Sequence, residues 1–138
     1  MIRIERVIDV LPAGFETLRA EARHEGHTMI ETLAAGWTAG ALRFNQPGEA
    51  LFAARVGTAL AGVGGLTQEP AIPGALRMRR FYVRAGYRRG GVGRALVGEL
   101  LRQAARPITA NAASGSERFW EAFGFTPDRR DGRTHILR

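Results

Sequence analysis

The stretch that decides the fold is LRMRRFYVRAGYRRGGVGRAL, residues 76–96. It opens with a strand-like segment, continues through a glycine-rich turn and ends in an apolar stripe of helical period. The strand part holds four apolar residues that change from even to odd positions, Leu76, Met78, Phe81 and Val83. Because side chains alternate strictly across a strand, this change requires one extra residue. The sequence therefore predicts a β-bulge near Arg79-Arg80, which bends the strand and can open a gap in the sheet.

The glycine-rich turn, Arg88-Arg89-Gly90-Gly91-Val92-Gly93-Arg94, joins this strand to a helix predicted for residues 92–104. Glycines near a helix start let backbone N–H groups converge on a ligand without interference from a Cβ. The helix N-terminus adds unsatisfied donors and the positive end of its dipole. The turn therefore predicts a phosphate or pyrophosphate site, with simple helix capping as the alternative.

Two common phosphate-binding motifs do not fit this turn. A nucleotide P-loop requires Lys followed by Ser or Thr, whereas all 20 basic residues of the chain are Arg. A dinucleotide-binding fingerprint requires a third Gly where this chain has Leu96, and it follows the first strand of a βαβ unit rather than a hairpin. The phosphate ligand is therefore expected to be of another kind.

Outside this stretch the chain consists of short predicted helices and strands. Further helices are predicted over residues 13–25, 27–39 and 115–123, and further strands over residues 2–7, 50–56, 59–66, 108–111 and a final hairpin over 125–138. The two hairpins are expected to turn at Gly57-Thr58 and at Asp131-Gly132. The order β-α-α-β-β-β-α-β-α-β-β predicts one mixed α/β (α+β) domain over residues 1–138.

Composition narrows the function classes. The chain has 138 residues, a net charge of +7 and no Cys, so disulfides, thiolate metal sites and a Cys nucleophile are excluded, and no metal is expected. The apolar runs are too short to cross a bilayer, and the N-terminus lacks the apolar block of a signal peptide. We therefore expect a cytoplasmic protein without a membrane partner. The positive charge favours an anionic ligand, although an Arg-rich surface alone explains it equally well.

At this point the chain resembles the GNAT superfamily of acetyltransferases. The family's turn Gln/Arg-x-x-Gly-x-Gly/Ala is matched by residues 88–93, and RRFYVRAGYRRGGVGRALV and SERFWEAFGF resemble its strand and its Phe-Tyr helix. The segments RFNQPGEALFAA and AGVGGLTQEP are similar to a bacterial subgroup whose members mostly lack assigned substrates. The resemblance covers nearly the whole chain. It implies a mostly antiparallel sheet with about four helices, in which the bulge of the fourth strand splays two parallel strands around a pantetheine arm.

The resemblance also implies a set of acetyl-CoA-binding residues. In the turn, backbone N–H groups are expected to hold the pyrophosphate, with the loop comprising Arg88, Arg89, Gly90, Gly91, Val92, Gly93, Arg94 and Ala95. The pantetheine is expected along Phe81, Tyr82 and Val83, with further contacts from Asn111, Ser116, Phe119 and Trp120. The N–H of Val83 is the implied oxyanion donor to the thioester carbonyl.

At the positions of the catalytic acid and base, the sequence departs from the pattern of the family. Trp120 stands where the family commonly has a Tyr acid, and its indole N–H cannot deliver a proton at neutral pH. Glu69 is the first candidate for the base, with Glu25, His27 or a water molecule as alternatives. For the acceptor amine we expect a pocket that includes Trp37, Arg43, Phe44 and Gly65, although Trp37 also suits the core.

Three functions follow as hypotheses. The first is an N-acetyltransferase that moves an acetyl group from acetyl-CoA directly to an amine of a small molecule or peptide. The second is a catalytically degenerate acyl-CoA-binding module. The third is a basic nucleic-acid-binding protein, which ranks lower because no nucleic-acid motif is visible and the aromatics do not interleave with Arg. A homodimer is possible, because many relatives dimerise.

Overall fold

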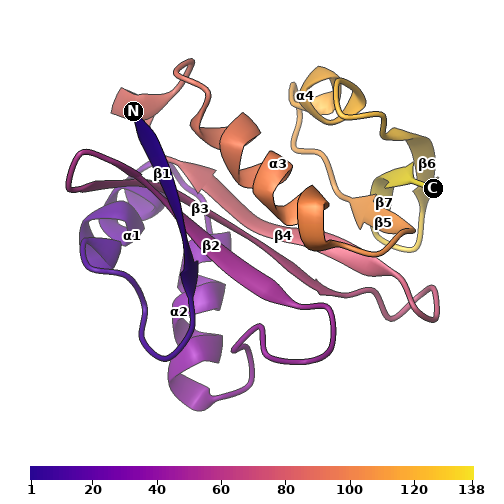
Figure 1. Ribbon diagram of the computed structural model, residues 1–138, viewed down its shortest axis with the longest axis horizontal. Coiled ribbons are helices and arrows are strands. Elements are labelled where there is room, and N and C mark those ends of the chain that lie inside the picture. Colours follow the sequence, from indigo (N-terminus) through magenta and orange to yellow (C-terminus); the bar gives the residue numbers. More distant parts are fainter.

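The computed structural model describes residues 1–138 and contains seven strands and four α-helices (Figure 1). The strands are β1 (Ile2–Val7), β2 (Ala50–Val56), β3 (Ala59–Gln68), β4 (Leu76–Val83), β5 (Ile108–Ala110), β6 (Thr126–Arg130) and β7 (Arg133–Leu137). The helices are α1 (Phe15–His24), α2 (Met29–Ala39), α3 (Val92–Gln103) and α4 (Glu117–Glu121). A short 3₁₀ turn at Ala85–Tyr87 links β4 to the glycine-rich turn. No helix combines the length and the apolar character needed to span a bilayer.

All seven strands form one sheet in the order β1-β2-β3-β4-β5-β7-β6. Every neighbouring pair is antiparallel except β4 and β5, which run parallel. The predicted α+β fold and the predicted element order are therefore confirmed. Helix α4 is shorter than its predicted span of residues 115–123, and the chain after it turns at Gly124, whose φ is +95°.

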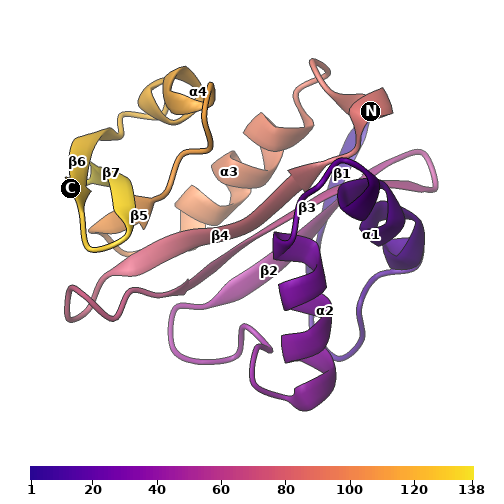
Figure 2. The same ribbon diagram turned by 180° about the vertical axis from the view of Figure 1, so that it is seen from behind.

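The helices cover both faces of the sheet (Figures 1 and 2). Helix α3 packs on one face through a stripe of buried residues, Val92, Leu96, Val97 and Leu100, because apolar side chains recur there at helical spacing. Helices α1 and α2 lie on the opposite face, as Figure 2 shows. The alternation of strand side chains thus builds two cores, one on each side of the sheet.

The bulge lies where the change of parity predicts it. Arg79 pairs with Gly65 and Tyr82 pairs with Val63, so that Arg80 and Phe81 together oppose the single residue Gly64. Arg80 has the left-handed φ of +61°, which is uncommon outside Gly. The bulge switches the side of the strand on which the following residues lie, so the sequence predicted it correctly.

Strands β4 and β5 share only a short ladder. They pair at Leu76 with Ile108 and at Arg77 with Thr109, and no later residue of β4 pairs with β5. Beyond Arg77 the two strands separate, and the edge of β4 that faces β5 has no neighbouring strand. This separation positions the candidate site.

Candidate functional site

The glycine-rich turn presents a row of free backbone donors. None of the N–H groups of residues 89–94 donates a hydrogen bond within the protein, and the first donor of the α3 region is the N–H of Ala95, bonded to the carbonyl of Gly91 at 2.9 Å. Gly91 caps α3 with a φ of +88°, and Arg89 has a φ of +67°. Left-handed residues followed by a helix start turn successive amides toward a common point, an arrangement that binds anions.

A cavity of about 330 Å³ lies against this turn. Its walls come from the end of β4, the turn itself, the start of α3 and α4, through Val83, Tyr87, Arg88, Arg89, Gly91, Val92, Gly93, Arg94 and Phe119. Three of the lining side chains are guanidinium groups. The cavity therefore combines free amides, a helix N-terminus and positive charge, which together suit a pyrophosphate.

A second cavity of about 300 Å³ continues from the first into the separation between β4 and β5. Both cavities share Val83, Gly93 and Phe119, so together they form one passage, which we call the channel. The inner part is lined by Met29 of α2, by residues 78–83 of β4, and by Asn111, Ala113, Ser116 and Trp120 near β5 and α4. The bulge and the short β4–β5 ladder thus produce the gap that the sequence predicted.

The backbone of β4 faces this gap through alternate residues. The N–H of Arg84 donates to the carbonyl of Ala61 on β3 at 2.9 Å, so Arg84 and Tyr82 direct their backbone groups toward β3. By strand alternation, Val83 directs its backbone groups toward the gap, and Phe81, inside the bulge, lines the same cavity. The carbonyl of Val83 accepts a hydrogen bond from Nε of Arg88 at 2.9 Å.

Trp120 forms part of the channel wall. It is buried, and its ring packs edge-on against Phe81, Phe119 and Phe125 with centroid distances of 5.4, 5.1 and 5.5 Å. Such edge-to-face packing fixes the position of the ring. Trp120 is therefore a packing residue here and not a source of protons.

A charged cluster joins the turn to the α1–α2 connection. Arg88 donates to both carboxylate oxygens of Glu25, at 3.0 Å from Nη1 and 2.6 Å from Nη2, and the Tyr82 hydroxyl donates to the same carboxylate. The hydrogen bonds from Arg88, and then the one from Tyr82, lower the pKa of Glu25 from 4.5 to about 2. Burial, reinforced by Glu25, raises the pKa of Tyr82 to about 12. A carboxylate with so low a pKa is a weak base, so Glu25 does not suit the role of general base.

We expect this cluster to shape the acid sensitivity of folding. Because the folded-state pKa of Glu25 is lowered from 4.5 to about 2, its contribution to the free energy of unfolding is present above pH 4.5 and is lost as the pH falls toward about 2. Urea unfolding across this window should show a steeper loss of stability for the wild type than for Glu25→Gln. Glu16→Gln, at an exposed carboxylate 3.5 Å from Arg19, is the control and should keep the wild-type slope. Equal slopes for the wild type and Glu25→Gln would contradict the prediction.

Most of the predicted acetyl-CoA-binding residues meet along the channel. Residues 81–83, Arg88, Arg89, Gly91, Val92, Gly93, Arg94, Asn111, Ser116, Phe119 and Trp120 all line it. Gly90 lies between lining residues and contributes a free N–H. Ala95 does not line the channel, and its N–H is used inside the helix.

The residues predicted for the acceptor pocket lie elsewhere. Trp37 and Phe44 are buried in the core between the sheet and helices α1 and α2. Arg43 donates to the carbonyl of Trp37 at 2.7 Å and stacks on its ring. Gly65 is close to Phe44, since a Cβ there would lie 2.5 Å from Cε1 of that ring. These four residues build the fold on the side of α2 and do not line the channel.

Glu69 also lies away from the channel. It is only 3 % exposed, and its carboxylate accepts hydrogen bonds from the Thr109 hydroxyl at 2.9 Å and from the N–H of Ala71 at 3.1 Å. These bonds tie the β3–β4 loop to β5 at the end where β4 and β5 are still paired. The structure thus gives Glu69 a structural position and does not bring it to the place expected of a base.

Several channel residues were not selected from the sequence, namely Met29, Met78, Arg79, Arg80 and Ala113. The bulge was the available signal for the two arginines. In a regular strand Arg79 and Arg80 would point to opposite faces, whereas the extra residue lets both line one cavity. For Met29 the sequence offers no comparable indication, because the distance of Met29 from β4 depends on how α2 packs against the sheet.

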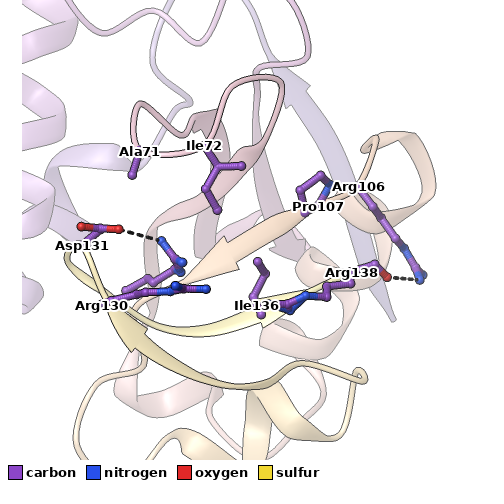
Figure 3. A pocket seen from close by; sticks show the side chains of 9 residues that line it. Ala71, Ile72, Arg106, Pro107, Arg130, Asp131, Ile136 and Arg138 are labelled. Atoms are coloured by element: carbon purple, nitrogen blue, oxygen red, sulfur yellow. Dashed lines mark hydrogen bonds and ion pairs between the residues drawn. The ribbon is translucent and has the colours of Figure 1, made fainter.

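Another cavity, of about 620 Å³, lies at the far end of the β5–β7–β6 part of the sheet and shares no residue with the channel (Figure 3). Arg106, Arg130, Arg133 and Arg138 line it. Two carboxylates pair with three of these arginines, because Asp128 lies 2.9 Å from Arg130, 3.2 Å from Arg133 and 3.5 Å from Arg138, and Asp131 lies 3.6 Å from Arg133. Arg106 donates to the carbonyl of Arg138 at 3.4 Å. Clustered arginines on this surface are therefore largely paired.

Comparisons with known proteins identify the family model and the solved structures that this chain resembles. The family model for the acetyltransferase (GNAT) domain matches residues 18–137. The fold is similar to that of an inferred acetyltransferase from Exiguobacterium sp. 255-15, with a TM-score of 0.89 and 23% identity over 99% of this chain and 93% of that one. It is also similar to the N-acetyltransferase YlbP of Bacillus subtilis in complex with coenzyme A, with a TM-score of 0.66 and 21% identity over 99% and 96% of the chains. A third similar structure is glucosamine-6-phosphate N-acetyltransferase from Arabidopsis thaliana, with a TM-score of 0.63 and 11% identity over 95% of each chain.

No protein of curated function matches the sequence. The family model nevertheless covers residues 18–137, most of the chain. The chain therefore belongs to the GNAT family of acetyltransferases.

Proposed function

We propose that this protein transfers an acetyl group from acetyl-CoA to the amine of a small molecule or peptide. Members of the GNAT family use acetyl-CoA as the acetyl donor. The observation that carries the proposal is the channel, which joins six free amides at residues 89–94 to the gap between β4 and β5. One end suits a pyrophosphate, and the other is lined mostly by apolar residues, as a pantetheine arm requires.

The residues present fit coenzyme A by their chemistry. The N–H groups of residues 89–94 and the side chains of Arg89 and Arg94 would hold the pyrophosphate. The backbone of Val83, turned toward the gap, and that of Phe81 would hold the pantetheine, with Asn111 and Ser116 on the opposite side. Acetyl-CoA supplies an acetyl thioester at the inner end of the channel.

The protein would promote transfer through position and through hydrogen bonding. An N–H of Val83, or of Phe81, would donate to the thioester carbonyl as negative charge develops on its oxygen. The C–N bond forms as the C–S bond breaks, the electron pair leaves with sulfur, and the amine loses a proton. Neither a carboxylate nor a histidine lines the channel, so this proton would pass to water. Holding the reactants together would supply most of the rate enhancement.

Two measurements test the proposal. Calorimetry with acetyl-CoA is expected to show saturable binding at modest salt, and an assay for free thiol is expected to show CoA release when an acceptor amine is added. Binding without release, over a broad panel of amines, would instead support the acyl-CoA-binding module, for which the absence of a carboxylate or histidine from the channel lining is the specific argument. Failure of the wild type to bind acetyl-CoA would overturn both functions.

A further inference from the structure

Two arginines at the inner end of the channel have no ion-pair partner. Arg79 and Arg80 both line the cavity between β4 and β5, and neither guanidinium group forms an ion pair or donates a hydrogen bond within the protein. Nε of Arg80 is buried with no acceptor. Several other arginines that are partly buried, Arg19, Arg55, Arg84 and Arg133, are by comparison paired with carboxylates.

This arrangement is unfavourable without a ligand. Burial, followed by repulsion from neighbouring arginines, lowers the pKa of both Arg79 and Arg80, and at Arg79 a weaker attraction from Glu69 opposes the shift without reversing it. A half-buried cation without a partner destabilises a fold, and two adjacent ones do so further. Perturbed charges of this kind cluster at functional sites.

The bulge is what directs both arginines into the cavity. Arg80 adopts the left-handed φ of +61° inside the bulge, and it lines the same cavity as Arg79 although the two are consecutive in a strand. The glycine-rich turn does not account for them. It lies at the other end of β4, beyond Val83, and has arginines of its own at positions 88, 89 and 94.

We propose that the acceptor amine carries a carboxylate or a phosphate, and that Arg79 and Arg80 bind this anionic group beside the thioester. The inference rests on the proposed acetyl transfer and narrows its acceptor. Guanidinium groups present planar forks of N–H donors that match either anion with paired hydrogen bonds. Such an acceptor would be held by its anionic end, leaving the amine free to reach the acetyl group.

Matched acceptors test the charge requirement. Amino acids are to be compared with their amides, and 2-aminoethyl phosphate with ethanolamine, at fixed acetyl-CoA. We expect kcat/KM for at least one anionic acceptor to exceed that of its neutral counterpart by about tenfold or more. The amino-acid pair and the phosphate pair show separately which anion the site takes.

Variants at Arg79, with a control on β6, assign the effect to a residue. Arg79→Gln is expected to lower kcat/KM for the anionic acceptor by about tenfold or more and to leave the neutral one unchanged, whereas Arg79→Lys should lower it less. Arg129→Gln, the same change at an exposed arginine outside both cavities, should retain wild-type kinetics. Unchanged acetyl-CoA binding by Arg79→Gln shows that the variant is folded.

The outcomes separate the inference from the proposed function. If acetyl-CoA binds but neutral acceptors react as well as anionic ones, or if Arg79→Gln loses activity equally toward both, the anionic acceptor is overturned and acetyl transfer stands. If no anionic acceptor is acetylated, the inference is also overturned. Only a failure to bind acetyl-CoA removes the proposed function with it.

Discussion

Replacing Gly93 by Asp is expected to weaken acetyl-CoA binding by about 100-fold or more. Gly93 is the second residue of α3, and its free N–H lies among the donors proposed for the pyrophosphate. Its φ is not left-handed, and a Cβ there would lie 3.4 Å from the Phe119 ring, which is ordinary contact. The substitution therefore adds little strain, and its main effect is a negative charge. Like charges about 4 Å apart near a protein surface repel by roughly 4 kcal/mol, more than the about 2.8 kcal/mol that a 100-fold loss requires.

The control for this prediction lies on the same helix. Gly98 has no atom within 4 Å of its Cβ position, so Gly98→Asp introduces the same charge without a clash and away from the turn. Calorimetry should show near wild-type affinity for Gly98→Asp. The Gly93→Asp protein should remain folded in thermal unfolding, because an acid in the first turn interacts favourably with the helix dipole. Wild-type affinity in Gly93→Asp would place the pyrophosphate elsewhere.

The fold could be predicted because its main devices are local. The change of parity between Met78 and Phe81 predicts the bulge, since alternation is a property of the strand itself. The turn at Gly57-Thr58 is also local, and it has the positive φ at Gly57 that the prediction requires. The glycine-rich turn needs only a strand, glycines and a helix start in succession. Each of these features is encoded within about ten residues.

The acceptor side could not be predicted in the same way because it depends on packing between distant elements. Glycines in a strand indicate that something approaches closely, but they do not distinguish a ligand from a side chain of the same protein. At Gly65 the approaching group is the Phe44 ring, so the expected acceptor surface is part of the core. Glu69 is similar, because its partner Thr109 is 40 residues away and only the β4–β5 pairing brings them together.

Gly64 lies in β3 against the ring of Phe81, which is part of the channel wall. Replacing Gly64 by Ala is therefore expected to lower both the stability of the fold and the affinity for acetyl-CoA. A Cβ at Gly64 would lie 2.6 Å from Cδ1 and 2.8 Å from Cζ of Phe81, the residue that lies opposite it in the bulge. The Phe81 ring is held in turn by edge-on contact with Trp120 at 5.4 Å, so it cannot move without shifting the channel wall. Overpacking of this kind costs about 1–3 kcal/mol. We therefore expect urea unfolding to show a loss of that size and acetyl-CoA to bind several-fold more weakly.

A double-mutant cycle identifies the cause. Replacing the ring by the smaller side chain of Leu in Phe81→Leu should restore much of the stability lost in Gly64→Ala. The double variant should then lose less free energy of unfolding than the sum of the two single variants, by about 1 kcal/mol or more. Gly98→Ala, at an open position inside α3, is the control for the added methyl group and should stabilise the protein by about 0.5–1 kcal/mol. Strict additivity of Gly64→Ala and Phe81→Leu would show that the Phe81 ring is not what excludes a side chain at position 64. A coupling of the expected sign would show that Gly64 is needed because the bulged strand turns the Phe81 ring toward it.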